Sequence, residues 1–258
     1  MENLHISKNS LEQWLNQMLK KGMRVLAPVQ QGDKIDFRQI TSPDEVATDY
    51  VQTTQSVKRV VFPTAEVLFS YHKEGKDTTL KDSNPDAIPE TVLWKIRPCD
   101  AAGFAPLSGI FNWDYKDKLY NARRAKTTLI SFSCSRCDEA CFCTSVNGGP
   151  GNTNGSDIQV TLLPDGSAFV EILTMKGKAL AKLYIVEFEP AGDIDKDKYL
   201  ATVTTHFTPE AIREKLTDAF DSPVWKQQSE RCLGCGACAF VCPTCACFDI
   251  QEDAKGSS

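Results

Sequence analysis

The sequence predicts a mixed α/β (or α+β) body over residues 1–205, followed by a small helical, cysteine-rich domain over residues 206–258. The first part contains several strand-like apolar runs together with an amphipathic helical segment at its start. The second part begins with two short helices that have clear capping residues, and these lead into a dense group of cysteines. With 258 residues, 41% of them apolar, the chain is long enough to bury a full core.

The N-terminal part of the body is expected to begin with a helix. Ser10 is the expected N-cap, Gln13 its capping-box partner, and Gly22 the residue that ends the helix. The elements that follow are a mixture of strands, one short helix and a charged, turn-rich connection. In chain order they are strands at 23–29, 34–40 and 57–62, a helix at 64–72 and the connection at 73–84.

The second half of the body contains two strand-like apolar runs, 91–96 and 127–132, each of which leads directly into cysteines. Sites in α/β sheets usually lie at the carboxyl ends of the strands, so these cysteines are expected at one edge. A β-hairpin is expected from 158–163 and 168–173, with 183–188 as a partner strand. Helices are then expected from the Thr208 cap and from the Ser222 cap.

Four cysteines near the C-terminus have the spacing C-x2-C-x2-C-x3-C-P, namely Cys232, Cys235, Cys238 and Cys242. This spacing is typical of bacterial ferredoxins, in which the first three thiolates bind one [4Fe-4S] cluster and the fourth binds another. The helical domain is therefore expected to be ferredoxin-like. Cys245 and Cys247 are further candidates to complete a cluster. The alternatives are a zinc knuckle, which usually has two separated C-x2-C pairs, and a disulfide-bonded knot.

A second candidate site lies in the middle of the chain, after the two buried strands. Four of its five cysteines would bind an iron–sulfur cluster, with Asp100 as an oxygen ligand or hydrogen-bonding neighbour. The alternatives are a zinc site and structural cysteines that behave as small buried hydrophobic residues. The five cysteines are Cys99, Cys134, Cys137, Cys141 and Cys143.

Together the two groups contain all eleven cysteines, enough for two four-cysteine clusters with three left over. A reactive cysteine nucleophile is a weaker interpretation, because none of the three histidines forms a recognisable Cys–His pattern. The basic residues Arg123, Arg124 and Lys126 favour a solvated face over a site for an acidic partner or a flavin phosphate.

Composition excludes several other classes of function. A net charge of −5 argues against a nucleic-acid-binding protein that uses a basic face. No signal peptide and no long apolar run is found, so we expect a cytoplasmic protein without membrane insertion. Clustered cysteines in a cytosolic protein favour metal or redox chemistry over structural disulfides.

Several motifs in combination resemble a known family. They are Arg97-Pro98-Cys99-Asp100, Cys141-Phe142-Cys143 with its glycine-rich successor, Phe220-Asp221-Ser222-Pro223, and the cysteine run from Cys232 to Cys245. The chain resembles the iron–sulfur beta subunit of cytoplasmic nickel–iron sulfhydrogenases, and it is similar to the iron–sulfur subunit of anaerobic sulfite reductase. The resemblance covers residues from about 90 to the end.

The resemblance implies an electron-transfer subunit of a hetero-oligomeric, anaerobic redox complex, with two [4Fe-4S] clusters. It would relay electrons between a flavin-containing, NAD(P)H-reactive partner and a catalytic redox subunit. The sequence differs from the family in one respect, since family members continue to a second ferredoxin run. If the chain is shortened, Cys242 lacks its companions. Otherwise Cys245 or Cys247 completes the first cluster, or Cys242 joins the ligands of the middle site.

Two other functional hypotheses remain open at this point. One is a zinc-binding interaction or scaffold module without redox activity. The other is an enzyme that acts on a small substrate at the middle cluster, which would require an iron with an open coordination position. Asp100 beside Cys99 is the one sequence feature that favours such an iron.

Overall fold

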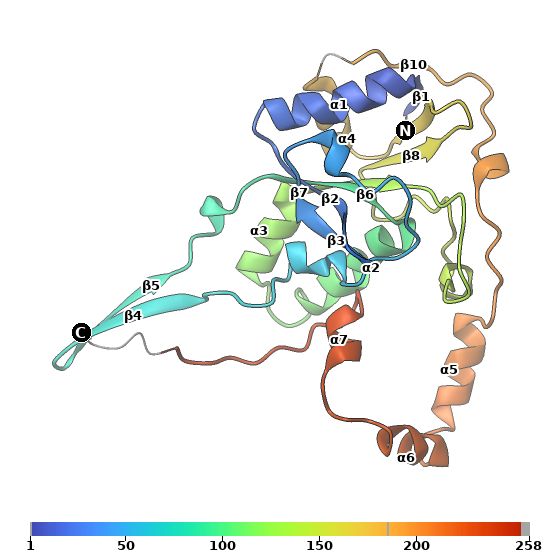
Figure 1. Ribbon diagram of the computed structural model, residues 1–258. Helices are drawn as coiled ribbons and strands as arrows, with labels where there is room; N and C mark the ends of the chain where they lie inside the picture. Colours follow the sequence, from blue (N-terminus) through green and yellow to red (C-terminus); the bar gives the residue numbers. More distant parts are fainter. Residues whose placement is uncertain (1, 185, 254–258) are drawn as a thin grey trace.

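A mixed sheet forms the centre of the body (Figure 1). The computed structural model describes residues 2–184 and 186–253, and this part of the chain contains an eight-stranded sheet with the order β10-β1-β9-β8-β7-β6-β2-β3. Strands β2, β6, β7 and β8 are parallel to one another, whereas the pairs β2–β3, β8–β9, β1–β9 and β1–β10 are antiparallel. The strands are β1 Glu2–Ile6, β2 Arg24–Gln31, β3 Lys34–Gln39, β6 Thr91–Ile96, β7 Thr127–Phe132, β8 Ile158–Leu162, β9 Ala168–Ile172 and β10 Glu189–Pro190.

Helices cover both faces of this sheet and form a core on each side. On one face, Trp14 and Met18 of α1 (Lys8–Lys20) and Leu180 of α4 (Met175–Lys182) pack on Val92 and Ile130. The other face is covered by α2, α3 and the short 3-10 helix η2, with bounds α2 Pro98–Ile110, α3 Lys118–Lys126 and η2 Val57–Val60. The mixed α/β body expected from the sequence is therefore confirmed.

Two parts of the chain extend away from the body (Figure 1). Strands β4 (Phe69–Glu74) and β5 (Asp77–Asp82) form a separate protruding hairpin. Helices α5 (Pro209–Thr217) and α6 (Pro223–Ser229) form an arm, after which α7 (Ala237–Val241) returns to lie beside α2. The chain after α7 then runs toward the hairpin, where the Tyr71 hydroxyl donates a hydrogen bond to Glu252.

The described chain also contains four more short 3-10 helices within the segments that connect the strands and α-helices. They are η1 Pro43–Glu45, η3 Pro85–Ala87, η4 Cys143–Val146 and η5 Lys196–Tyr199.

A bulge at Lys95 interrupts β6 near its carboxyl end. The register with β7 shifts between Trp94 and Ile96, and Lys95 has a φ of 65°. In a regular strand, residues two apart face the same side of the sheet. Here Trp94 packs in the core under α1, whereas Ile96 packs in the opposite core under α2. The bulge therefore turns the end of β6 toward α2, which begins two residues later at Pro98.

The expected N-terminal helix is present, but its start was placed three residues too late. The helix begins at Lys8, and the side chain of Ser7 caps it by accepting a hydrogen bond from the Ser10 amide. Ser7 and Ser10 are both capping residue types, so local sequence alone does not choose between them. Gly22 follows the helix with a φ of 74°, which confirms its expected role as the terminating residue.

The predictions for residues 57–84 were wrong. Residues 57–60 form η2, and the expected helix at 64–72 is instead a connection that leads into β4. The charged residues at 73–84 contain β5, which pairs with β4 across a turn at Gly75. The hairpin residues are exposed on both faces, so they carry no apolar alternation from which a strand could be predicted.

The partner strand expected at 183–188 was also wrong. Ile185 lies outside the described residues, and the other five residues form no strand, because α4 ends at Lys182 and β10 begins at Glu189. The neighbour of β9 is β1, the N-terminal strand, which pairs with it from Glu2 to Ile6. The expected strands at 91–96 and 127–132 and the β8–β9 hairpin are confirmed.

Candidate metal centres

The middle cysteines lie at the carboxyl ends of two adjacent parallel strands. Strand β6 leads into α2, whose first turn contains Cys99, and β7 leads into the loop that contains Cys134. Cys143 begins η4 farther along the same loop. Because β6 and β7 are parallel neighbours, their ends bring Cys99 and Cys134 to one edge of the sheet, as the sequence predicted.

The thiols in this group influence one another's ionisation. Burial is the main cause of a raised pKa at Cys99, and the neighbouring charges of Asp100, Cys134 and Cys143 raise it further. Burial also raises the pKa of Cys134 to about 11, although the charge of Arg97 acts in the opposite direction. Burial raises the pKa of Asp100 to about 6. Bare anions are therefore unfavourable here, whereas a bound metal cation would deprotonate its thiol ligands outright.

The segment 201–206 is joined to the cysteine loop by hydrogen bonds. The Ala201 amide donates to the Cys134 carbonyl at 2.7 Å, and the Cys137 thiol donates to the Thr202 carbonyl at 3.2 Å. Farther along, the His206 amide donates to the buried Ser145 hydroxyl at 2.9 Å. The chain that links the body to the helical arm is thus part of the wall of the middle site.

Arg97 is the cation that lies beside these thiols. Its guanidinium carbon lies 3.9 Å from the centre of the Tyr50 ring, and its charge acts to lower the pKa of both Cys134 and Asp100. The Nε atom of Arg97 is buried and has no hydrogen-bond partner among the described residues. An unpaired N–H donor of this kind could donate a hydrogen bond to the sulfur of an iron–sulfur cluster bound by these thiols.

The C-terminal cysteine run forms a tight loop suited to a cluster. Gly234 and Gly236 have φ values of 69° and 71°, which favour glycine because it lacks a Cβ. The Gly234 amide donates to the Cys232 sulfur at 3.4 Å. Backbone amides directed at thiolate sulfur are among the features that set the potential of iron–sulfur clusters.

Cys242, at the end of this run, has a thiol with a lowered pKa. Burial acts to raise its pKa, but hydrogen bonds from Thr244 and Cys245 outweigh this and lower the pKa to about 7. The Thr244 hydroxyl lies 3.3 Å from the Cys242 sulfur. The hydrogen bond with Cys242 is in turn the main cause of a raised pKa at Cys245. Cys242 and Cys245 are therefore neighbours, which fits the expectation that one or both bind a cluster.

The end of the cysteine run is docked on the body. The buried Lys58 ammonium donates to the carbonyl oxygens of Ala239 and Cys245, both at 2.8 Å. Pro243 lies against Gly103 of α2, so closely that a Cβ at Gly103 would be 3.2 Å from the Pro243 Cβ. Because Gly103 is about one helical turn from Cys99, α2 links the two cysteine groups.

Among the described residues, no three Cys, His, Asp or Glu side chains are arranged closely enough to bind a metal ion. The residues at both sites nonetheless fit an iron–sulfur cluster by their thiol chemistry, the amide directed at Cys232 and the unpaired donor of Arg97. The assignment of each cysteine, and of Asp100, as a ligand stays a prediction. The exposed cysteines are Cys99, Cys232, Cys235, Cys238 and Cys247.

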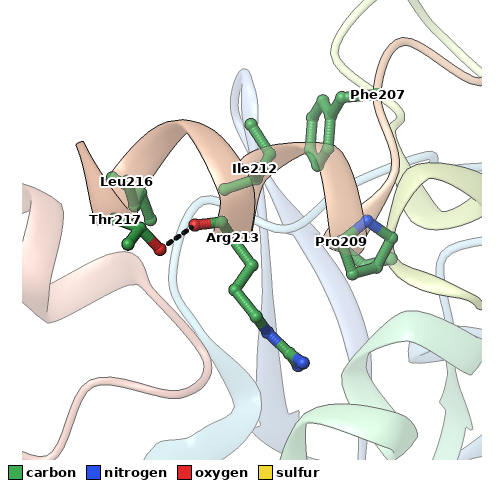
Figure 2. A pocket seen from close by; sticks show the side chains of 7 residues that line it. Phe207, Pro209, Ile212, Arg213, Leu216 and Thr217 are labelled. Atoms are coloured by element: carbon green, nitrogen blue, oxygen red, sulfur yellow. Dashed lines mark hydrogen bonds between the residues drawn. The ribbon is translucent and has the colours of Figure 1, made fainter. Parts of the chain in front are cut away.

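An apolar groove of about 590 Å³ lies beside the middle site (Figure 2). Phe207, Ile212 and Leu216 line it from the start and one face of α5, and Val146 lines it from the end of η4. Figure 2 shows the Arg213 side chain extending away from these apolar groups, while its carbonyl accepts a hydrogen bond from the Thr217 hydroxyl. The apolar side chains of Ile212 and Leu216 on α5 are thus partly solvent-exposed.

Comparison with known proteins supports the sequence motifs. Residues 231–258 match the family described as a 4Fe-4S dicluster domain. Sulfhydrogenase 2 subunit beta from Pyrococcus furiosus is 29% identical over 241 residues, which cover 91% of this chain and 70% of that protein. The chain is related to a sulfhydrogenase beta subunit. No solved structure matches it.

This relationship to a sulfhydrogenase beta subunit confirms the suspected resemblance and the iron–sulfur character of the chain. The helical C-terminal region coincides with the family match, which supports the predicted fold class. None of the helices in the described part of the chain is both long and apolar enough to cross a bilayer.

Sequence reasoning missed two residues that shape these sites. Lys58 had no recognisable signal, because its partners are 181 and 187 residues away in the chain. Arg97 was noticed only as part of the Arg-Pro-Cys-Asp motif, and its position two residues before Cys99 could have indicated a cation at the site. The basic residues at 123–126 are largely engaged within the protein, since Arg123 pairs with Glu66 and Lys126 donates to the Asp86 and Ile88 carbonyls.

Proposed function

We propose that the protein is an electron-transfer subunit that relays single electrons between two partners in a hetero-oligomeric complex. One partner would be a flavin-containing, NAD(P)H-reactive subunit, and the other a catalytic redox subunit of the hydrogenase or sulfite reductase type. The observation that carries this proposal is the contact of Pro243 with Gly103, because it joins the ferredoxin run to the helix whose first turn contains Cys99.

Two groups of residues would bind the clusters. Cys232, Cys235 and Cys238 would bind three irons of one cluster, with Cys245 or Cys247 as the fourth ligand. The second would be bound by four ligands from the middle group, with Asp100 and Cys242 as further candidates. When bound, each [4Fe-4S] cluster supplies one-electron redox chemistry whose potential depends on hydrogen bonds, charge and solvent exposure.

The exposed side chains of the arm support a role within a complex. Phe220 is 89% exposed and Leu233 is 93% exposed, and both are large apolar residues. A contiguous exposed apolar surface usually contacts another protein, and Phe207, Ile212 and Leu216 line such a surface on the same arm. The Pyrococcus furiosus relative is by name one subunit of a sulfhydrogenase, which supports a hetero-oligomer here. A cytoplasmic location is part of the same proposal.

The test is to measure iron, zinc and acid-labile sulfide per chain in anaerobically purified protein, with EPR spectra before and after dithionite. We expect about eight irons and eight sulfides, because two cubanes contain four irons each. The reduced protein should show signals that are absent from the oxidised protein. Zinc without sulfide would overturn the proposal and favour the scaffold module.

One cysteine variant at each site shows which cysteines bind which cluster. Cys134→Ser should remove about four irons if the middle site is occupied, and Cys235→Ser should remove about four from the C-terminal site. A fully loaded Cys134→Ser protein would remove that residue from the proposed ligand set. Cys99→Ser tests the α2 thiol in the same way.

A further inference from the structure

A buried cationic frame lies at the carboxyl end of β6, beside the middle thiols. The frame consists of Tyr50, Lys95 and Arg97. Tyr50 is 2% exposed, and its hydroxyl donates a hydrogen bond to the Lys95 carbonyl. The Arg97 guanidinium lies over the Tyr50 ring. Stacking on an aromatic face fixes a guanidinium in one plane, which an ammonium would not achieve.

The frame is tied to both the sheet and the cysteine loop by residues 47–52. Lys95 donates to the carbonyls of Ala47 and Thr48, both at 2.8 Å. On the loop side, Asp49 pairs with Arg136 at 2.7 Å, and the Gln52 amide donates to Asp138 at 3.1 Å. Lys95, which has a φ of 65°, is thus held by residues 47–50 through both its carbonyl and its ammonium.

Of the two cations in the frame, Arg97 has a buried nitrogen without any hydrogen-bond partner among the described residues. The Lys95 ammonium already donates to two carbonyls, whereas the Arg97 Nε has no hydrogen-bond partner among the described residues. An unsatisfied buried donor is costly, and native proteins rarely retain one without a role. Arg97 is the N-cap residue of α2, two residues before Cys99, and the preceding strand β6 ends beside β7, which leads into Cys134.

We propose that Arg97 is the counter-charge of the middle iron–sulfur site, and that Tyr50 and Lys95 hold it there. This inference rests on the proposed function. A fixed positive charge and a free N–H donor beside a cluster favour the state with one additional electron. Arg97 therefore raises the reduction potential of the middle site relative to a protein that lacks this charge.

The test is an EPR-monitored redox titration of the full-length, cluster-loaded protein. The Cys134→Ser variant identifies which of the reduction steps belongs to the middle site. Arg97→Gln removes the charge, and we expect it to make reduction of that site harder by on the order of tenfold, which is about 59 mV for a one-electron couple. The reduction potential of the C-terminal site should not change.

Two variants serve as controls. Arg97→Lys keeps the charge without the planar fork, so its shift should be smaller than that of Arg97→Gln and in the same direction. Arg38→Gln removes an exposed arginine from the edge strand β3 and should leave both potentials unchanged. A potential in Arg97→Gln equal to that of the unmodified protein would overturn the inference.

Loss of the cluster is also informative. If Arg97→Gln loses the middle iron while Arg97→Lys retains it, the charge is needed to hold the cluster, which supports the inference. If both variants lose it equally, Arg97 has only a packing role and the inference is wrong. Unmodified protein without a middle cluster would instead show that the proposed function fails.

Discussion

The Lys58 ammonium and the Cys245 carbonyl oxygen lie 2.8 Å apart, although 187 residues separate them in the chain. Lys58 is buried in η2, and it also donates to the Ala239 carbonyl in the middle of α7. One side chain of the body therefore fixes both sides of the Cys242–Pro243 corner. The docking of the ferredoxin run depends on this lysine together with the Gly103 contact.

Lys58→Met should loosen residues 239–248 without unfolding the sheet. The substitution leaves two carbonyls without their donor, at a cost of about 1–3 kcal/mol. Hydrogen exchange measured by mass spectrometry should show faster exchange in this segment and unchanged protection in β6 and β7. Arg59→Ala, at an exposed neighbouring position, is the matched control. Equal protection of residues 239–248 in Lys58→Met and in unmodified protein would contradict the role of Lys58 in docking this segment.

Gly103 and Gly109 provide a matched pair within α2. A Cβ at Gly109 meets no atom within 4 Å, so Gly109→Ala should stabilise the protein by about 0.5–1 kcal/mol through helix propensity. A Cβ at Gly103 would lie 3.2 Å from Pro243, so Gly103→Ala should gain less, and Gly103→Leu should displace Pro243. Thermal unfolding of the three variants checks the order. A Gly103→Leu protein as stable as Gly109→Ala would exclude the close contact.

Gly155 lies where the loop after the middle cysteines meets α2. Its φ is 82°, and an added Cβ would lie 2.2 Å from the Ala101 carbonyl oxygen. Gly155→Ala should therefore destabilise the protein by roughly 2 kcal/mol or more, from the backbone strain and the clash together. Gly149→Ala, whose Cβ meets no atom within 4 Å, should be close to neutral. Urea denaturation of both variants measures the difference.

The buried ammonium of Lys95 should make stability depend on pH. Burial, together with the charge of Arg97, lowers the pKa of Lys95 from 10.5 to about 8. Between these values the unfolded chain binds more protons than the folded protein, so this group makes folding more favourable as pH rises. The increase should be at most about 1.4 kcal/mol per pH unit.

The measurement is the free energy of unfolding in urea at pH 8, 9 and 10. Lys95→Met should remove the increase, whereas Lys34→Met, at an exposed position in β3, should retain it. Lys95→Met will also be less stable at every pH, because the Ala47 and Thr48 carbonyls lose their donor. A Lys95→Met protein with an unchanged pH slope would assign the dependence to another group.

The sequence by itself determined the elements whose signals are local. The buried strands Thr91–Ile96 and Thr127–Phe132 are continuous apolar runs, and the Thr208 and Ser222 caps are set by residues within one turn. The spacing of the cysteines from Cys232 to Cys242 likewise predicted the iron–sulfur match over 231–258. Each of these features depends on neighbours along the chain, so each could be recognised without a fold.

Only the tertiary structure decided which distant residues meet. The insertion of β1 between β9 and β10, the bulge at Lys95 and the docking of Cys245 on Lys58 join segments that are far apart in the chain. Local propensity is weak compared with the packing of whole layers, so it fixes neither strand partners nor the residue that satisfies a distant carbonyl. The position of Arg97 beside the middle thiols follows from that packing, since it requires β6, β7 and residues 47–52 to be assembled together.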